Sequence, residues 1–171
     1  MINKPSKQFE LLSRWAMSLL EPENFESTLI NDDSFEIILE KTTYCDLLLF
    51  NYSDNKSIEK SRKFVMEYLI NKDNDLFQRY KTAFILDRMI NDPDELLPGL
   101  RYLSGMARSC NFIPEIFIGL ESETDMVTTK DQIDLWEKSA FIKAQQPLDL
   151  YRDQIIEAAR ELRQTLKDYG V

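Results

Sequence analysis

The chain has 171 residues, of which 43% are hydrophobic and 30% charged, and it carries a net charge of −9 without a single histidine. The absence of histidine excludes Ser–His–Asp and Cys–His catalysis and zinc–histidine sites. The negative charge argues against binding to nucleic acids or acidic membranes. Only four glycines and six prolines are present, which disfavours a turn-rich all-β fold.

No apolar run approaches the ~20 residues that a membrane span needs. The first twelve residues, MINKPSKQFELL, lack the apolar core of a signal peptide. We therefore expect a cytoplasmic protein. In that reducing compartment Cys45 and Cys110 are expected to be small buried residues and not a disulfide.

Apolar residues at helical spacing predict a first helix over about 7–21, with Ser6 as its N-cap. Pro22 suits the first turn of a short second helix. The stretch 35–52, FEIILEKTTYCDLLLFNY, is apolar on two helical faces. A helix apolar on two sides is normally surrounded by other elements. We therefore predict that 35–52 is the central helix of the core.

An amphipathic helix is predicted from Ser57 to about residue 71, followed by a turn, KDND, in which Asp73 and Asp75 are good capping residues. The next helix is expected to run to Ile90. Asn91-Asp92-Pro93 then predicts the start of another helix that reaches about residue 108. Pro98-Gly99 leaves open a later start, at Leu100.

The segment 111–120, NFIPEIFIGL, is compatible with a short helix from Pro114 or with an apolar strand. Pro114 and Gly119 weaken a strand in so short a run, and no partner strand is apparent. We favour the helix. Residues 121–125 are expected to form an acidic loop.

Two further helices are expected at the end of the chain. One begins near Thr128 to Asp131, and the last runs from Pro147 to about Tyr169 and ends at Gly170. Together the patterns predict an all-α fold of about eight or nine helices in a single globular domain over 1–171. Consecutive helix pairs also suit an α-solenoid, but no sequence motif repeats at a fixed period.

Two acidic patterns raise the possibility of magnesium chemistry. Asp32, Asp33 and Glu36 match the DDxxE pattern of terpene synthases, where carboxylates hold magnesium, but no second metal-binding stretch follows. Glu23 and Glu26 form an ExxE pair without the matching ExxD pair of helical nucleotide pyrophosphatases. Acids at a helix start also favour the helix dipole. We therefore assign no catalytic residue, metal ligand or cofactor.

The negative charge is concentrated in two blocks. Residues 21–54 contain nine acids and one lysine, for a net charge of −8, and residues 110–137 contain seven acids and one lysine, for −6. These blocks are either solvated helix ends or faces that attract a basic partner. The residues that we assign to a partner-binding surface are Glu21, Glu23, Glu26, Asp32, Asp33, Glu36, Glu121, Glu123, Asp125, Asp131 and Asp134.

A small acidic chain without catalytic equipment suits a protein-binding function. We expect a non-enzymatic inhibitor, a bacterial immunity protein or an antitoxin-like protein that covers a basic partner such as a toxin nuclease, because complementary charge speeds encounter and excludes wrong partners. The expected partner is another protein, not nucleic acid or membrane. A helical adaptor or scaffold is the alternative, followed by a magnesium-dependent carboxylate enzyme.

Overall fold

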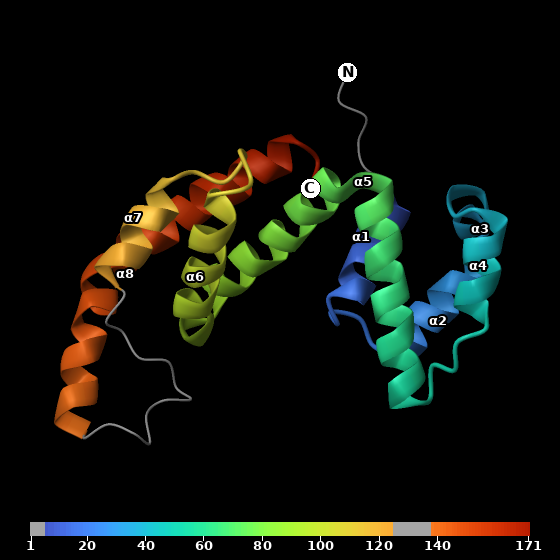
Figure 1. The fold of residues 1–171 in the computed structure, drawn as a ribbon, viewed down its shortest axis with the longest axis horizontal. Coiled ribbons are helices and arrows are strands. Elements are labelled where there is room, and N and C mark those ends of the chain that lie inside the picture. Colours follow the sequence, from blue (N-terminus) through green and yellow to red (C-terminus); the bar gives the residue numbers. More distant parts are fainter. Residues whose placement is uncertain (1–5, 125–137) are drawn as a thin grey trace. The chain divides into compact units, whose positions relative to one another are not determined.

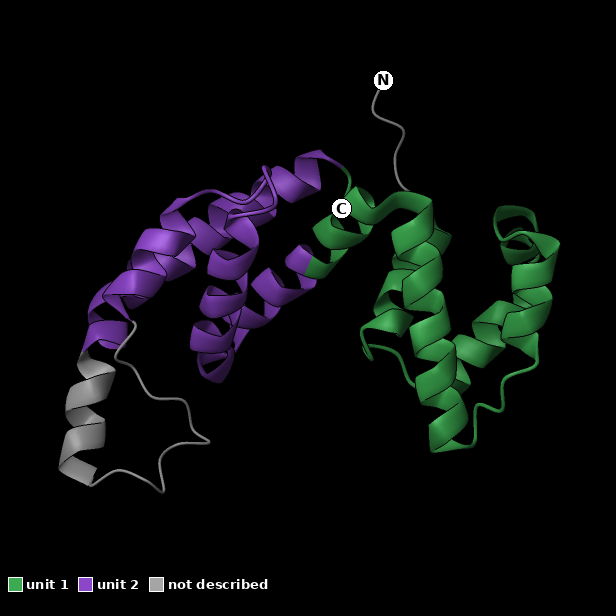
Figure 2. Cartoon of the chain, in the orientation of Figure 1, with its two compact units in different colours: residues 1–81, 170–171 green, residues 82–169 purple. Residues whose placement is uncertain are grey.

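The structure is a computed structural model that describes residues 6–124 and 138–171. The all-α prediction is confirmed: within these ranges the chain forms eight α-helices and one short 3-10 helix, η1 (Figure 1). The chain divides into two compact units, unit 1 with residues 1–81 and 170–171, and unit 2 with residues 82–169 (Figure 2). The single domain over 1–171 stays a prediction.

Unit 1 begins with helices α1, Lys7–Ala16, and α2, Pro22–Asn31. Ser6 caps α1 as predicted, because its hydroxyl accepts a hydrogen bond from the backbone N–H of Phe9 at 3.2 Å. The helix ends earlier than predicted. Ser18 adopts a φ of 60°, a left-handed conformation that stops a helix.

The prediction of one central helix over 35–52 is wrong. The segment forms two short helices, α3, Ser34–Ile38, and α4, Lys41–Leu48, separated by an extended backbone at Leu39 and Glu40. The break allows Leu39 to be buried, while Ile37 and Leu49 are 84% and 82% exposed. A helix apolar on both sides needs neighbours on both sides, and this segment of unit 1 is covered on one side only.

The expected burial of Cys45 is also wrong, because this side chain is exposed on α4. Cys110 is half-buried, and both cysteines are free thiols. The prediction that no disulfide joins them therefore holds, although burial does not explain Cys45. Its place on the outer side of α4 follows from the break at Leu39 and Glu40, which turns only one side of α4 toward the core.

Helix α5, Asn55–Asn91, contains a kink at Asp73, where φ is −161° and ψ is 87°. The Asp73 carboxylate accepts a hydrogen bond from the N–H of Leu76 at 3.0 Å, so it caps the second half of the helix. The predicted turn at 72–75 with Asp73 as a cap is therefore confirmed.

Unit 2 contains the end of α5, then η1, Pro93–Glu95, and α6, Leu96–Ala107. Pro98 and Gly99 lie in the first turn of α6 and do not delay its start. Proline is tolerated in that turn because its missing N–H would have no helical partner there. Leu100 and Leu103, which follow Pro98 and Gly99 on α6, are fully buried.

The segment 111–120 contributes to a helix, as favoured. This helix, α7, spans Ile116–Glu123 and starts two residues after Pro114. Residues 121–123, predicted as part of an acidic loop, are the last turn of α7. The polar composition of this turn suited a loop, but the buried Phe117 and Leu120 anchor the whole helix in unit 2.

The last helix, α8, spans Lys138–Asp168 and contains Pro147 in its interior, so the predicted start at Pro147 is wrong. Proline removes one helical hydrogen bond, but the alanine and glutamine residues before it favour helix and the chain continues through it. Gly170, with φ of 87°, follows the helix end as expected. The helix start predicted at 128–131 lies outside the described residues.

Candidate partner-binding surface

An aromatic cluster holds the helices of unit 1 together. Trp15 of α1 stacks on Phe25 of α2, with ring centroids 4.3 Å apart, and Tyr52 meets both rings at 5.7 Å. The Tyr52 hydroxyl donates a hydrogen bond to the Leu47 carbonyl at 2.8 Å, at the end of α4. The guanidinium carbon of Arg62, on α5, lies 4.6 Å from the centroid of the Trp15 ring. The cluster thus joins four helices.

Asp32 has a structural role at the start of α3. Its carboxylate accepts hydrogen bonds from the backbone N–H of Ser34 at 3.1 Å and from the Gln8 amide at 3.3 Å, and it also pairs with the Ser34 hydroxyl. These bonds, first of all the one from the Ser34 hydroxyl, lower the pKa of Asp32. Asp32 therefore links α1 to the α2–α3 junction.

The other acids of the first block lie mostly in solvent. Glu21, Glu23, Asp33 and Glu36 are exposed, and Glu26 is half-buried. Glu21 is the N-cap residue of α2 but makes no side-chain capping bond. Most of these acids therefore lie on the surface of unit 1, and Asp32 is the member that serves the fold.

Sequence reasoning missed the apolar part of this surface, because it placed Ile37 and Leu49 in the core. The polar run Glu40-Lys41-Thr42-Thr43, which interrupts the apolar pattern, was the local signal for the break that exposes them. We define the α3–α4 surface as the exposed side chains of these two helices and their caps that combine large apolar groups with carboxylates. They are Asp33, Glu36, Ile37, Glu40, Asp46, Leu48 and Leu49.

The carboxylates of the α3–α4 surface make no ion pair with the side chains that the structure describes. In residues 6–124 and 147–171, whose side chains are described, no ion pair involves Asp33, Glu36, Glu40 or Asp46. The surface therefore presents unpaired carboxylates beside exposed aliphatic groups, with one exposed cation, Lys41, at the start of α4.

Two acids of the second block that the structure describes make side-chain hydrogen bonds. Glu121 is half-buried and accepts a hydrogen bond from the Ser104 hydroxyl at 3.4 Å, which ties α7 to α6. Glu123 accepts one from the Tyr151 hydroxyl at 3.3 Å, a bond that ties α7 to α8. The negative charge of Glu123 is the largest of the causes that raise the pKa of Tyr151. Asp125, Asp131 and Asp134 lie outside the described residues. Glu121 and Glu123 belong to unit 2, whereas the first block belongs to unit 1.

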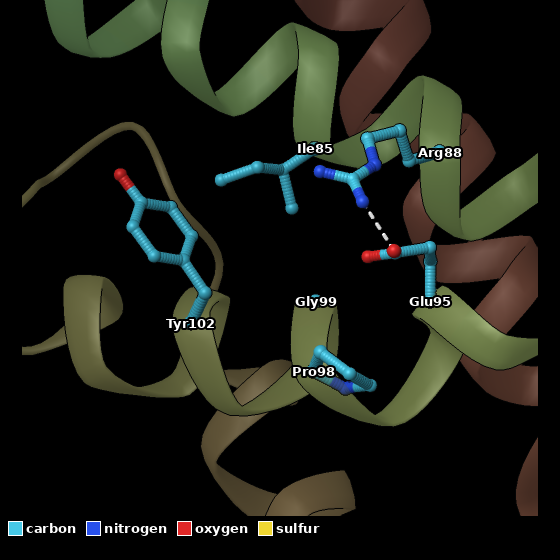
Figure 3. Close-up of a pocket in the computed structure, with 6 residues that line it drawn as sticks. All are labelled: Ile85, Arg88, Glu95, Pro98, Gly99 and Tyr102. Atoms are coloured by element: carbon cyan, nitrogen blue, oxygen red, sulfur yellow. Dashed lines mark hydrogen bonds and ion pairs between the residues drawn. The ribbon is translucent and has the colours of Figure 1, made fainter. Parts of the chain in front are cut away.

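Unit 2 contains a shallow pocket of about 180 Å³ between the end of α5 and α6 (Figure 3). An ion pair between Arg88 and Glu95 lies at one side, and Ile85 and Tyr102 lie at the other. The two charged groups that line this pocket therefore pair with each other.

The described residues contain no cluster of three or more side chains suited to hold a metal ion. In the same part of the chain, no helix has the length and apolar character to cross a membrane. In its described part the protein is all-α, and its α3–α4 surface combines exposed carboxylates with exposed aliphatic side chains. Comparison with known protein families, curated proteins and solved structures found no match to this chain.

Proposed function

We propose that this protein binds another protein through the α3–α4 surface and neutralises it, as an inhibitor, immunity protein or antitoxin neutralises a basic partner. The observation that supports the proposal is the exposure of Ile37, at 84%, on the short helix α3, where Glu36 and the N-cap residue Asp33 carry carboxylates that make no ion pair with the described side chains. Leu49, at 82% exposed, repeats the arrangement with Asp46 one turn before it.

Each of the two components has a distinct role in binding. Burial of apolar area contributes about 25 cal/mol per Å², so exposed isoleucine and leucine side chains gain free energy when a partner covers them. Carboxylates at the same surface attract a basic partner and raise the association rate. Exposed apolar groups bordered by polar residues are typical of protein interaction sites.

The alternatives have less support from the arrangement of the acids. A magnesium enzyme requires carboxylates that converge, whereas Asp32 is engaged by Ser34 and Gln8 while Asp33 and Glu36 face solvent. A helical adaptor would use the same α3–α4 surface. It differs from an inhibitor in leaving the activity of its partner unchanged.

The proposal is tested with a double variant and a matched control. Glu36→Lys/Ile37→Ser changes one carboxylate and one exposed aliphatic group of the α3–α4 surface. Leu150→Ser/Glu157→Lys makes the same kinds of change on α8, where Leu150 is 74% exposed. The partner is recovered by affinity purification of the native protein, and its binding to all three proteins is measured by calorimetry.

We expect the recovered partner to be basic, to lose its own activity in the complex, and to bind the control like the wild type. The Glu36→Lys/Ile37→Ser variant should bind at least about tenfold more weakly, since one lost contact of this kind accounts for about 1–2 kcal/mol. The association rate should fall as salt rises. Equal affinity for the two variants, or a rate independent of salt, would contradict the proposal.

A further inference from the structure

A row of lysines lies on the first turns of α5. Lys56, Lys60 and Lys63 are exposed, and of the three only Lys63 makes an ion pair within the described chain, a loose one to Glu67 at 3.9 Å. The first turn of α5 contains no acid. The helix dipole is positive at this end, so Lys56, in the first turn, is unfavourable for the helix itself. Lys56 and Lys60 thus make no ion pair within the described chain, although the exposed Glu59 lies between them in the sequence.

The lysine row borders the α3–α4 surface within unit 1. Phe64 of α5 lies 5.9 Å from Phe50, at the end of α4, and the Tyr68 hydroxyl lies 3.5 Å from the Ile38 carbonyl of α3. Residues four apart lie near the same side of a helix, so Lys60 lies on the side of Phe64, one turn before it, and Lys56 lies one turn before Lys60. Two surfaces of opposite charge are therefore neighbours on one unit.

We propose that the protein associates with a second copy of itself, the α3–α4 surface of each copy resting on the lysine row of the other. A two-fold symmetric interface requires a self-complementary surface, and two adjacent patches of opposite charge supply one. Ile37 and Leu49 pack against the aliphatic stems of Lys56 and Lys60, whose ammonium groups reach the carboxylates of Glu36 and Glu40. Self-association does not rest on the function proposed above, although a basic partner competes for the same α3–α4 surface.

A charge-reversal exchange tests this arrangement on the full chain. The acid-reversed variant carries Glu36→Lys/Glu40→Lys, and the base-reversed variant carries Lys56→Glu/Lys60→Glu. Each variant alone brings like charges together at both contacts of the symmetric pair. A 1:1 mixture of the two restores opposite charges at both contacts. Sedimentation velocity over a concentration series, at low and at high salt, measures association.

We expect the wild type to form dimers that dissociate as salt rises, each variant alone to dimerise at least about tenfold more weakly, and the mixture to recover a dimer of wild-type affinity. Glu157→Lys, on the exposed side of α8, is the control and should dimerise normally. If the reversals unfold the chain, as circular dichroism would reveal, Glu36→Gln/Glu40→Gln is used in their place, with a smaller weakening expected.

A wild type that remains monomeric at low salt overturns the proposal. So does a dimer that neither reversal weakens, or a mixture that fails to associate. A monomer that still binds a basic partner through Ile37 would leave the proposed inhibitor function intact. A dimer without any such partner would instead support self-association alone.

Discussion

Trp15 and Phe25 stack face to face, with ring centroids 4.3 Å apart and ring planes only 3° from parallel. Both side chains are completely buried, and each comes from a different helix. The stack therefore fixes α1 against α2, and through Tyr52 it also reaches the end of α4. The stack thus helps to hold α4, one of the two helices of the α3–α4 surface, in place.

Replacement of Phe25 by alanine should destabilise the protein by about 3–5 kcal/mol, because it removes a fully buried ring and leaves a cavity against Trp15. Ile30→Ala, five residues further along α2 at a position 55% exposed, is the control and should change the free energy of unfolding by less than about 0.5 kcal/mol. Urea denaturation measures both. Equal effects would mean that the stack contributes no packing energy.

Arg62 and Lys63 are adjacent on α5 but differ in environment. The Arg62 guanidinium lies over the Trp15 ring, while the Lys63 side chain is 79% exposed. Arg62→Met should lower the free energy of unfolding by about 0.5–2 kcal/mol through loss of the cation–π contact. Lys63→Met should leave it nearly unchanged, since exposed ion pairs contribute little. Urea unfolding that ranks the two variants in the reverse order would contradict the role of the contact.

Two glycines of α6 give opposite expectations. A Cβ added at Gly99 would overlap the side chain of the buried Met89 on α5, whereas a Cβ at Gly105 meets nothing within 4 Å. Gly99→Ala should therefore destabilise the protein by about 1–3 kcal/mol. Gly105→Ala should stabilise it by up to about 1 kcal/mol, since alanine favours helix over glycine. Thermal unfolding of the two variants separates the predictions, and a stabilising Gly99→Ala would show that Met89 moves aside freely.

The hydroxyl of Tyr52 should make stability sensitive to alkaline pH. Burial, with a smaller contribution from the Glu26 carboxylate, raises the pKa of Tyr52 above its usual value of about 10. The unfolded chain then ionises first, so the stability that this group contributes is complete below pH 10 and is lost as pH rises above it. The free energy of unfolding should decrease from about pH 10 upward.

Tyr52→Phe tests this dependence. At neutral pH it should cost about 1 kcal/mol, because the Leu47 carbonyl loses the hydrogen bond donated by Tyr52. Above pH 10 the variant should lose less stability than the wild type, and the difference between them should narrow. Tyr80, whose pKa is raised to about 12 mainly by burial, still makes the free energy of unfolding of both proteins decrease at alkaline pH. Urea unfolding at successive pH values gives the free energy of unfolding of both proteins. If it falls with pH equally in the two, Tyr52 does not cause the alkaline loss of stability.

Features governed by local chemistry were predictable from the sequence. The cap at Ser6, the proline at the start of α2, the capping role of Asp73 and the helix near 116 each depend on a few neighbouring residues. The exposed acids of the first block could be recognised in the same way. The helix start predicted at Pro147 is wrong because a proline inside a helix and a proline at its start cannot be told apart from the neighbouring residues alone.

The sequence by itself determined the helical class, the main capping residues and the concentration of negative charge in residues 21–54, because all three follow from residue type and spacing. Only the tertiary structure decided that 35–52 breaks at Leu39 and Glu40 and exposes Ile37 and Leu49. An apolar residue is buried only when other helices cover it. The number of helices that reach each side of a segment is a property of the packed unit, and helical periodicity does not contain it.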